Sequence, residues 1–184
     1  MQDKIELRAK LLKQLKEQDS SYRELAKAKL LNNILPLLSQ VKSVAGYRAL
    51  NFELSVDSVI EYFLSQNIQV YQPIAYRSTK EMQFAPFKWE SSTIFYDDKY
   101  LVPDSIKWYN LDLILVPLVA VDEFGHRLGK GGGYYDQTLS NNPGAHRPIL
   151  CGVGFACQLV KQVPYQDWDL SLDYFVSEDS LIKF

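Results

Sequence analysis

The chain has 184 residues, of which 47% are hydrophobic and 23% are charged, as in an ordinary globular protein with a substantial core. The net charge of −2 and the pI near 5.7 argue against general nucleic-acid binding, and no apolar run approaches the roughly 18 residues of a membrane span. We therefore expect one domain over residues 1–184, without nucleic-acid or membrane contacts. A monomer is also expected, although composition alone leaves the oligomeric state open. A cytoplasmic location is also expected, because the charged N-terminus carries no apolar signal region.

Helical and extended patterns alternate along the chain. The predicted helices cover residues 2–18, 21–35 and 56–65. The predicted strands cover residues 41–49, 68–75, 82–87, 111–121, 148–155 and 174–177. Strands that alternate with helices imply right-handed crossovers and a mainly parallel sheet. The predicted fold class is therefore α/β, a three-layer α/β/α domain with a mainly parallel central sheet.

Several residues mark the ends of the predicted helices. Ser21 and Glu24 have the spacing of a capping box, and Pro36 is expected to end or kink the second helix. Ser55 or Asp57 is expected to cap the third helix. The inward face of that helix is predicted to carry Val59, Ile60, Phe63 and Leu64.

A glycine-rich segment follows the apolar strand predicted over residues 111–121. Five glycines lie between residues 125 and 133, with Arg127 and Lys130 among them, and a short helical stretch begins at Tyr134. Glycines let backbone N–H groups approach an anion, and cations with a helix start complete a phosphate site. The spacing matches neither the Walker loop nor the dinucleotide loop, and a flexible hairpin connection is the alternative.

Other charged residues are candidates for the same site. Asp136 could hold the magnesium that accompanies a nucleotide. Alternatively, its negative charge could simply stabilise the start of the helix by interacting with the helix dipole. Lys4 and Arg8 share one helix face, where they could grip phosphates or form a solvated basic surface. His126 and His146 lie beside glycine or arginine in expected loops, so we expect them to be solvated and expect no histidine-based zinc site.

Three stretches carry a resemblance to a known family. Arg127-Leu-Gly-Lys-Gly-Gly-Gly-Tyr-Tyr-Asp136, preceded by Val116-Pro-Leu-Val-Ala-Val-Asp122, resembles the signature of the 5-formyltetrahydrofolate cyclo-ligase family. Lys4-Ile-Glu-Leu-Arg8 resembles the family's Lys-x-x-x-Arg near the chain start. Val163-Pro164 with Asp167-Trp168-Asp169 resembles its closing segment. The resemblance covers nearly the whole chain and is loose over residues 79–110.

The resemblance implies ATP- and magnesium-dependent conversion of 5-formyltetrahydrofolate to 5,10-methenyltetrahydrofolate, with release of ADP and phosphate. The formyl oxygen is phosphorylated first and the ring then closes, so ATP is a co-substrate and Mg²⁺ the cofactor. A non-catalytic folate- or nucleotide-binding module of the same fold is the main alternative. An ATP-dependent ligase or kinase acting on another small acid is a third possibility.

The resemblance also assigns roles to residues. The implied catalytic residues are Arg127, Lys130 and Tyr135. The implied ATP-binding residues are Lys4, Arg8, Arg127, Leu128, Gly129, Lys130, Gly131, Gly132, Gly133, Tyr134 and Tyr135. The substrate-binding residues are Glu53, Tyr135 and Trp89, with Met82 as a further wall of the folate pocket. The implied metal ligands are Asp136 and Asp169. On this basis Arg127→Ala is expected to raise the ATP requirement steeply and to leave the fold intact.

Overall fold

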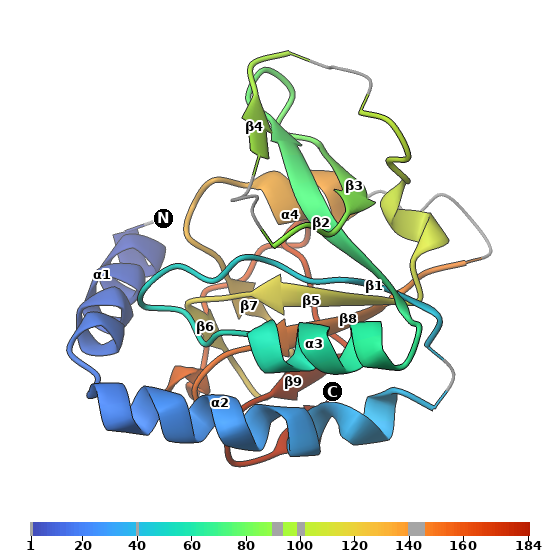
Figure 1. Ribbon diagram of the computed structural model, residues 1–184. Helices are drawn as coiled ribbons and strands as arrows, with labels where there is room; N and C mark the ends of the chain where they lie inside the picture. Colours follow the sequence, from blue (N-terminus) through green and yellow to red (C-terminus); the bar gives the residue numbers. More distant parts are fainter. Residues whose placement is uncertain (1, 40, 90–93, 99–101, 140–145) are drawn as a thin grey trace.

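A computed structural model describes residues 2–39, 41–89, 94–98, 102–139 and 146–184 (Figure 1). The helices are α1 Gln2–Lys16, α2 Ser20–Ile34, α3 Asp57–Ser65 and α4 Tyr134–Leu139, with 3-10 turns η1 Leu35–Leu37, η2 Trp108–Asn110 and η3 Ala156–Gln158. The strands are β1 Ser43–Ala45, β2 Gln69–Tyr76, β3 Met82–Pro86, β4 Ile94–Tyr96, β5 Leu113–Pro117, β6 Ala120–Val121, β7 Arg127–Leu128, β8 Ile149–Val153, β9 Tyr174–Val176 and β10 Leu181–Lys183. Every predicted helix and strand overlaps one of these elements.

Eight strands form the main sheet, in the order β10-β9-β8-β5-β1-β2-β3, with β4 paired to β2. The central pairs are parallel, whereas β3 and β10 run antiparallel at the two ends. This arrangement confirms the predicted α/β class with a mainly parallel sheet. Strands β6 and β7 form a separate antiparallel ribbon that the sequence patterns did not indicate.

Helices α2 and α3 lie together along one face of the sheet (Figure 1). Their buried residues follow a helical spacing, namely Ala26, Leu30 and Ile34 on α2 and Val59, Ile60 and Phe63 on α3. Leu64, which was expected to face inward, is 44% exposed. That prediction is wrong because each helical residue turns about 100° from the last, so Leu64 lies at the edge of the stripe.

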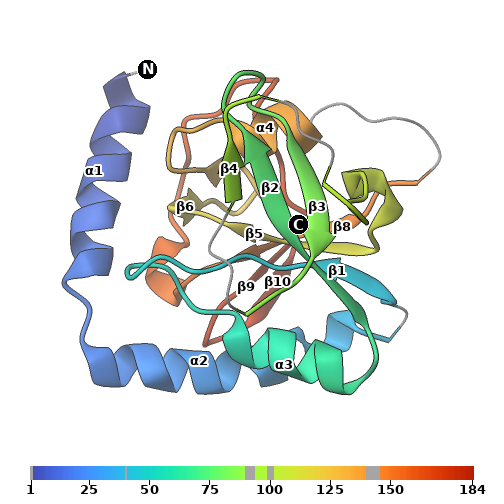
Figure 2. The same ribbon diagram turned by 45° about the horizontal axis from the view of Figure 1, so that its top comes forward.

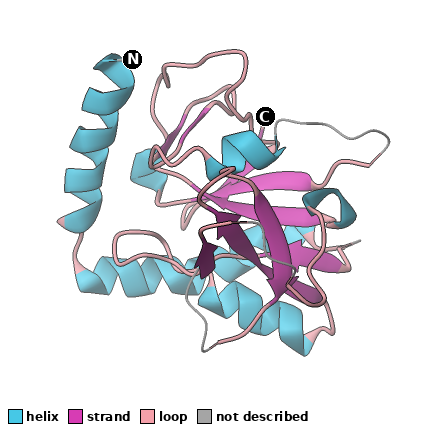
Figure 3. Cartoon of the chain, turned by 90° about the horizontal axis from the view of Figure 1, so that it is seen from above, coloured by secondary structure: helices cyan, strands magenta, loops and turns pink. Residues whose placement is uncertain are grey.

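The other face of the sheet is covered more thinly. Leu139 of the short helix α4, Trp108 of η2 and the segment of Leu170 and Leu172 pack against Ile114, Val116, Leu150 and Phe175 of the sheet. Seen from above the view of Figure 1, short helices and loops lie over this side (Figure 3). No described helix is long and apolar enough to span a membrane.

Local differences from the predicted elements have physical causes. Asp19, not Ser21, caps α2 by accepting a hydrogen bond from the Ser21 N–H at 2.7 Å. Pro36 lies in η1, where it ends α2 as predicted. The apolar run over residues 111–121 is not one strand, because the chain leaves the sheet after Pro117 to begin the ribbon.

Helix α1 stands at one side of the domain (Figure 2). Its Leu11 is buried in a small cluster with Val119, Ala120 and Leu128 of the ribbon region and with Val163. Leu11 and Leu15 lie one helical turn apart, and Leu15 joins the main core instead. The ribbon therefore connects α1 to the glycine-rich segment that follows β7.

Asp122 holds the turn of the ribbon together. Its buried carboxylate accepts the N–H groups of Phe124, His126 and Val163, each at 3.0 Å, and lies 3.1 Å from Nδ1 of His126. Burial acts to raise the pKa of Asp122, but the donors of Val163, His126 and Phe124 outweigh it and lower the pKa. The ionised carboxylate therefore stabilises the turn that leads into the glycine loop.

We predict that Asp122→Asn lowers the free energy of unfolding by about 1–3 kcal/mol at pH 7, because an amide cannot accept all these donors. A lowered folded-state pKa means that the stabilisation is present above the unfolded value of about 3.9 and is lost as pH falls through the folded value. The wild-type protein should thus have a higher urea midpoint than the variant at pH 7, and this difference should be smaller at pH 3. The exposed Asp179→Asn serves as control. A gap that stays constant with pH would contradict this role.

Candidate active site

Residues Gly129 to Gly133 connect β7 to α4. Gly131 has φ +100° and Gly133 has φ +76°, conformations that L side chains rarely adopt. Nε of Arg8 donates to the carbonyl of Gly129 at 2.8 Å, so α1 is fastened to the loop. The glycines thus shape a loop that the N-terminal helix borders.

Arg127 does not lie where the sequence patterns predicted it. The sequence places it inside the loop, whereas it belongs to strand β7 with only 4% of its side chain exposed. Its Nη1 donates to the carbonyl of Pro117 at 2.9 Å, and its Nη2 donates to both carboxylate oxygens of Asp136 at 3.1 and 3.2 Å. The guanidinium carbon lies 5.5 Å from the centre of the Tyr135 ring. Because Arg127 joins β5, β7 and α4, we now expect Arg127→Ala to destabilise the fold as well as to weaken the use of ATP.

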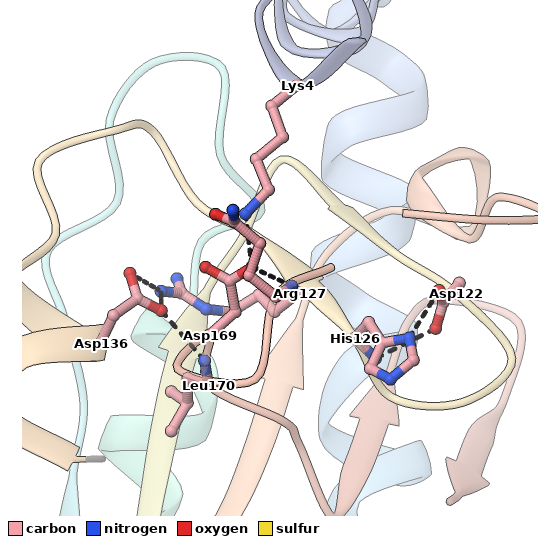
Figure 4. A network of polar contacts seen from close by, with 8 residues as sticks. Lys4, Asp122, His126, Arg127, Asp136, Asp169 and Leu170 are labelled. Atoms are coloured by element: carbon pink, nitrogen blue, oxygen red, sulfur yellow. Dashed lines mark hydrogen bonds and ion pairs between the residues drawn. The ribbon is translucent and has the colours of Figure 1, made fainter. Parts of the chain in front are cut away.

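Two carboxylates and Lys4 gather around Arg127 (Figure 4). Lys4 forms an ion pair with Asp169, and the same Asp169 oxygen accepts the N–H of Gln166 at 2.8 Å. The next residue, Leu170, donates its N–H to Asp136 at 3.3 Å. Asp136 and Asp169 therefore lie on adjoining segments although 33 positions separate them in the chain.

A cavity of about 630 Å³ opens against the glycine loop. The predicted site residues that line it are Glu53, Met82, Trp89, Arg127, Gly129, Lys130, Gly131, Gly132, Gly133, Tyr134, Tyr135 and Asp136. Nζ of Lys130 lies 2.9 Å from Oε1 of Glu53, whose side chain is 5% exposed. This ion pair joins the glycine loop to the segment after β1, so the predicted phosphate and folate groups share one cavity.

Two tyrosines of the cavity stay protonated at neutral pH. Burial raises the pKa of the Tyr135 phenol, and the neighbouring charge of Arg127 opposes the rise only in part. Burial also raises the pKa of Tyr47, with the charge of Glu53 as a further cause. Tyr134 instead packs its ring 5.8 Å from that of Phe95. Both Tyr134 and Tyr135 line the cavity, and Tyr135 can offer a substrate its O–H.

Some predicted residues lie outside the lining. Lys4, Arg8 and Asp169 border the loop from α1 and from the segment before β9. The side chain of Leu128 packs into the α1–ribbon cluster, so only its backbone can face a ligand. His126, expected to be solvated, stacks on Tyr165 with ring centres 3.9 Å apart and contacts Asp122.

The sequence patterns did not single out Tyr47, Arg48 or Phe95 as site residues, although all three line the cavity. Tyr47 and Arg48 follow β1, and the carboxyl ends of parallel strands are where ligands bind in such sheets. That rule was a signal that could have found them. Phe95 lies on the short strand β4, for which no sequence pattern was recognised.

Comparison with protein-family models matches residues 1–178 to the 5-formyltetrahydrofolate cyclo-ligase family. The chain belongs to this family. A 5-formyltetrahydrofolate cyclo-ligase of Haemophilus influenzae is 34% identical over 140 residues, which are 72% of this chain and 74% of the relative. Its Escherichia coli counterpart is 31% identical over 148 residues, or 77% and 81% of the two chains.

Solved structures agree on the fold. The 5,10-methenyltetrahydrofolate synthetase of Mycoplasma pneumoniae aligns with a TM-score of 0.77 at 22% identity, covering 96% of this chain and 99% of its own. The synthetase of Aquifex aeolicus aligns with a TM-score of 0.79 at 24% identity, covering 98% and 92%. As a cyclo-ligase of this family, the protein converts 5-formyltetrahydrofolate to 5,10-methenyltetrahydrofolate with ATP. The non-catalytic alternative is not favoured.

We predict that Arg127→Lys lowers the free energy of unfolding by about 1–3 kcal/mol, because lysine cannot reach both Pro117 and Asp136 with a planar fork. Arg147→Lys is the matched control, since Arg147 forms a more exposed ion pair with Asp173 at 2.7 Å. The control should change stability by less than about 0.5 kcal/mol. Urea denaturation followed by tryptophan fluorescence measures both, and equal losses in the two variants would contradict the joining role of Arg127.

Proposed function

We propose that the cyclo-ligase reaction takes place in the 630 Å³ cavity, with the glycine loop holding the ATP phosphates and Glu53 holding the pterin. The observation that carries this proposal is the set of three ion pairs around the loop. Each pair joins a cation suited to phosphate with a carboxylate expected to serve folate or metal, namely Lys4 with Asp169, Arg127 with Asp136 and Lys130 with Glu53. We further predict a monomer that contacts neither nucleic acid nor membrane, located in the cytoplasm.

The reaction needs an activated formyl group, because an amide-like carbonyl is a poor electrophile. The formyl oxygen attacks the terminal phosphorus of ATP, and the bond to ADP breaks with its electrons remaining on ADP. Nitrogen 10 of the folate then attacks the formyl carbon and loses its proton. Phosphate leaves with the former formyl oxygen, which gives the methenyl bridge. This sequence requires positioning and charge neutralisation but no protein nucleophile.

The chain's own groups divide these tasks. Arg127, Lys130 and the backbone N–H groups of the glycine loop neutralise phosphate oxygens, with Lys4 and Arg8 reaching the loop from α1. Tyr135 donates its O–H near the formyl group, since its raised pKa keeps the phenol protonated. Trp89 and Met82 form apolar walls for the folate ring.

The Lys130–Glu53 pair connects the two substrates. A pterin presents paired N–H donors that suit the carboxylate of Glu53. When Glu53 turns to the pterin, Lys130 loses its partner and becomes available to a phosphate. Each substrate therefore frees the group that the other needs, and by linkage the effect is equal in both directions.

The residues near Asp136 fit a magnesium ion that arrives with the nucleotide. Mg²⁺ typically takes one or two carboxylates and completes its shell with phosphates and waters. The carboxylates of Asp136 and Asp169 offer about four acceptor positions each and use fewer in their protein contacts. The described residues contain no group of three or more metal-ligating side chains. Once bound, the ion would supply positive charge to the phosphate oxygens.

The direct test mixes the protein with ATP, magnesium and 5-formyltetrahydrofolate and follows absorbance of the methenyl product. We expect a rise that disappears when ATP is omitted. Lys130→Gln should raise the KM for ATP by about ten-fold, the effect of one charged hydrogen bond. A flat trace for the wild type, with folate binding retained, would refute the reaction and favour a binding module.

We predict that Asp136→Asn and Asp169→Asn each raise the magnesium concentration for half-maximal rate by about ten-fold or more. Asp179→Asn, which changes an exposed carboxylate away from the loop, should leave the magnesium titration unchanged. The titrations are run at saturating ATP. Curves for the two site variants that coincide with the wild-type curve would rule out the metal role.

A further inference from the structure

The central strand β5 ends at Pro117, and the path that the chain takes from there sets the place of the ribbon. Leu118 and Val119 connect β5 to β6, and both are buried. The N–H of Val119 donates to the carbonyl of Leu128 on β7 at 2.7 Å. The carbonyl of Pro117 accepts a hydrogen bond from Arg127 at 2.9 Å. The exit from β5 therefore supports the strand from which the glycine loop starts.

A buried glutamine holds this exit. Gln158 lies in the 3-10 turn η3 after β8 and is 2% exposed. Its Nε2 donates to the carbonyl of Leu118 at 2.7 Å and to that of Val119 at 3.2 Å. Its Oε1 accepts the N–H of Phe155 at 2.7 Å. The side-chain amide thus serves two acceptors and one donor of the backbone, a combination that neither a carboxylate nor an apolar side chain can offer.

Two glycines at the end of β8 make room for these groups. A Cβ on Gly154 would lie 2.7 Å from Oε1 of Gln158 and 3.2 Å from Cδ1 of Leu118. A Cβ on Gly152 would lie 2.7 Å from Cδ2 of Leu118 and 2.5 Å from Cδ1 of Leu172. Close-packed interiors do not accommodate such approaches without a shift. The two glycines, to which the sequence patterns assigned no role, therefore provide the space that Leu118 and Gln158 occupy.

Further contacts lead from this exit to the glycine loop. Val119 is bonded through its carbonyl to Gln158 and through its N–H to Leu128, so the position of β7 depends on both contacts. Arg127 and Gly129 flank Leu128 in the chain. A Cβ on Gly129 would lie 3.0 Å from Nη1 of Arg127, so the guanidinium lies directly against the first residue of the loop. A displaced Val119 would therefore displace the guanidinium and the start of the loop together.

We propose that Gln158 is a positioning residue for ATP, which fixes the exit from β5 so that Arg127 and the start of the glycine loop face the phosphates. The inference rests on the proposed phosphate-binding role of the loop. Gln158 acts through the backbone, since it is not among the residues that line the 630 Å³ cavity. Its hydrogen bonds reach neither Glu53 nor Trp89, which are expected to hold the folate. Loss of the amide should thus affect ATP and spare the folate.

Gln158→Met keeps the approximate length of the side chain and removes its hydrogen bonds. With 5-formyltetrahydrofolate saturating, the KM for ATP should rise about three- to ten-fold, because misplaced contacts lose part of their binding energy. With ATP saturating, the KM for the folate should change by less than about two-fold. Gly154→Ala keeps the glutamine but pushes it from its place, so the KM for ATP should rise by a smaller factor. If Gln158→Met does not fold, Gly154→Ala carries the test.

Two further variants identify the cause of any change. Ile34→Ala leaves a void at the buried end of α2, so it should lower the urea midpoint and leave both KM values unchanged. A Gln158→Met protein that behaves in the same way, or whose KM rises equally for both substrates, would overturn the positioning role. Lys130→Gln tests the loop itself. An unchanged KM for ATP in Lys130→Gln would refute phosphate binding by the loop, whereas a rise in Lys130→Gln alone would overturn only the role of Gln158.

Discussion

The ion pair between Arg127 and Asp136 is the interaction on which the site depends. It joins the end of the β6–β7 ribbon to the first turn of α4, across the five residues that are expected to hold phosphate. The third contact of Arg127, with the carbonyl of Pro117, ties both to the end of the central strand β5. Loss of this one guanidinium would leave a partly buried carboxylate without its partner and would release the glycine loop at both ends.

In the other two ion pairs, as in Arg127–Asp136, a cation beside the loop faces a carboxylate. Lys4 and Lys130 also face carboxylates before any substrate arrives, so the cations are held in place without the repulsion of an unpaired cluster. In the proposed reaction, phosphate replaces the carboxylate partner of each lysine, while magnesium or pterin replaces the lysine partner of each carboxylate. Asp122 supports the arrangement from outside by fixing the turn that directs β7 toward the loop.

The sequence predicted the features that depend on local pattern. Apolar periodicity located helices α1, α2 and α3 and strands β1, β2, β3, β5, β8 and β9, but not β4, β7 or β10. The glycines with Lys130 located the loop. The pairing of charges was not predictable in this way, because Lys4 and Asp169 lie 165 positions apart and meet only through tertiary packing. Arg127 was misplaced because a two-residue strand is too short to show alternation. Tyr47 and Arg48 were not predicted to line the cavity, although they follow β1, because the rule for the carboxyl ends of parallel strands was not applied to them.

The exchange of partners at Lys130 and Glu53 predicts that ATP and folate strengthen each other's binding, which thermodynamic coupling measures. The dissociation constant of a non-hydrolysable ATP analogue is measured with and without saturating 5-formyltetrahydrofolate, for the wild type and for Glu53→Gln. We predict tighter wild-type binding when folate is present. In Glu53→Gln the analogue should bind more tightly than to the wild type even without folate, and folate should add nothing. A wild-type dissociation constant that is the same with and without folate, or coupling that persists in Glu53→Gln, would rule out this exchange of partners.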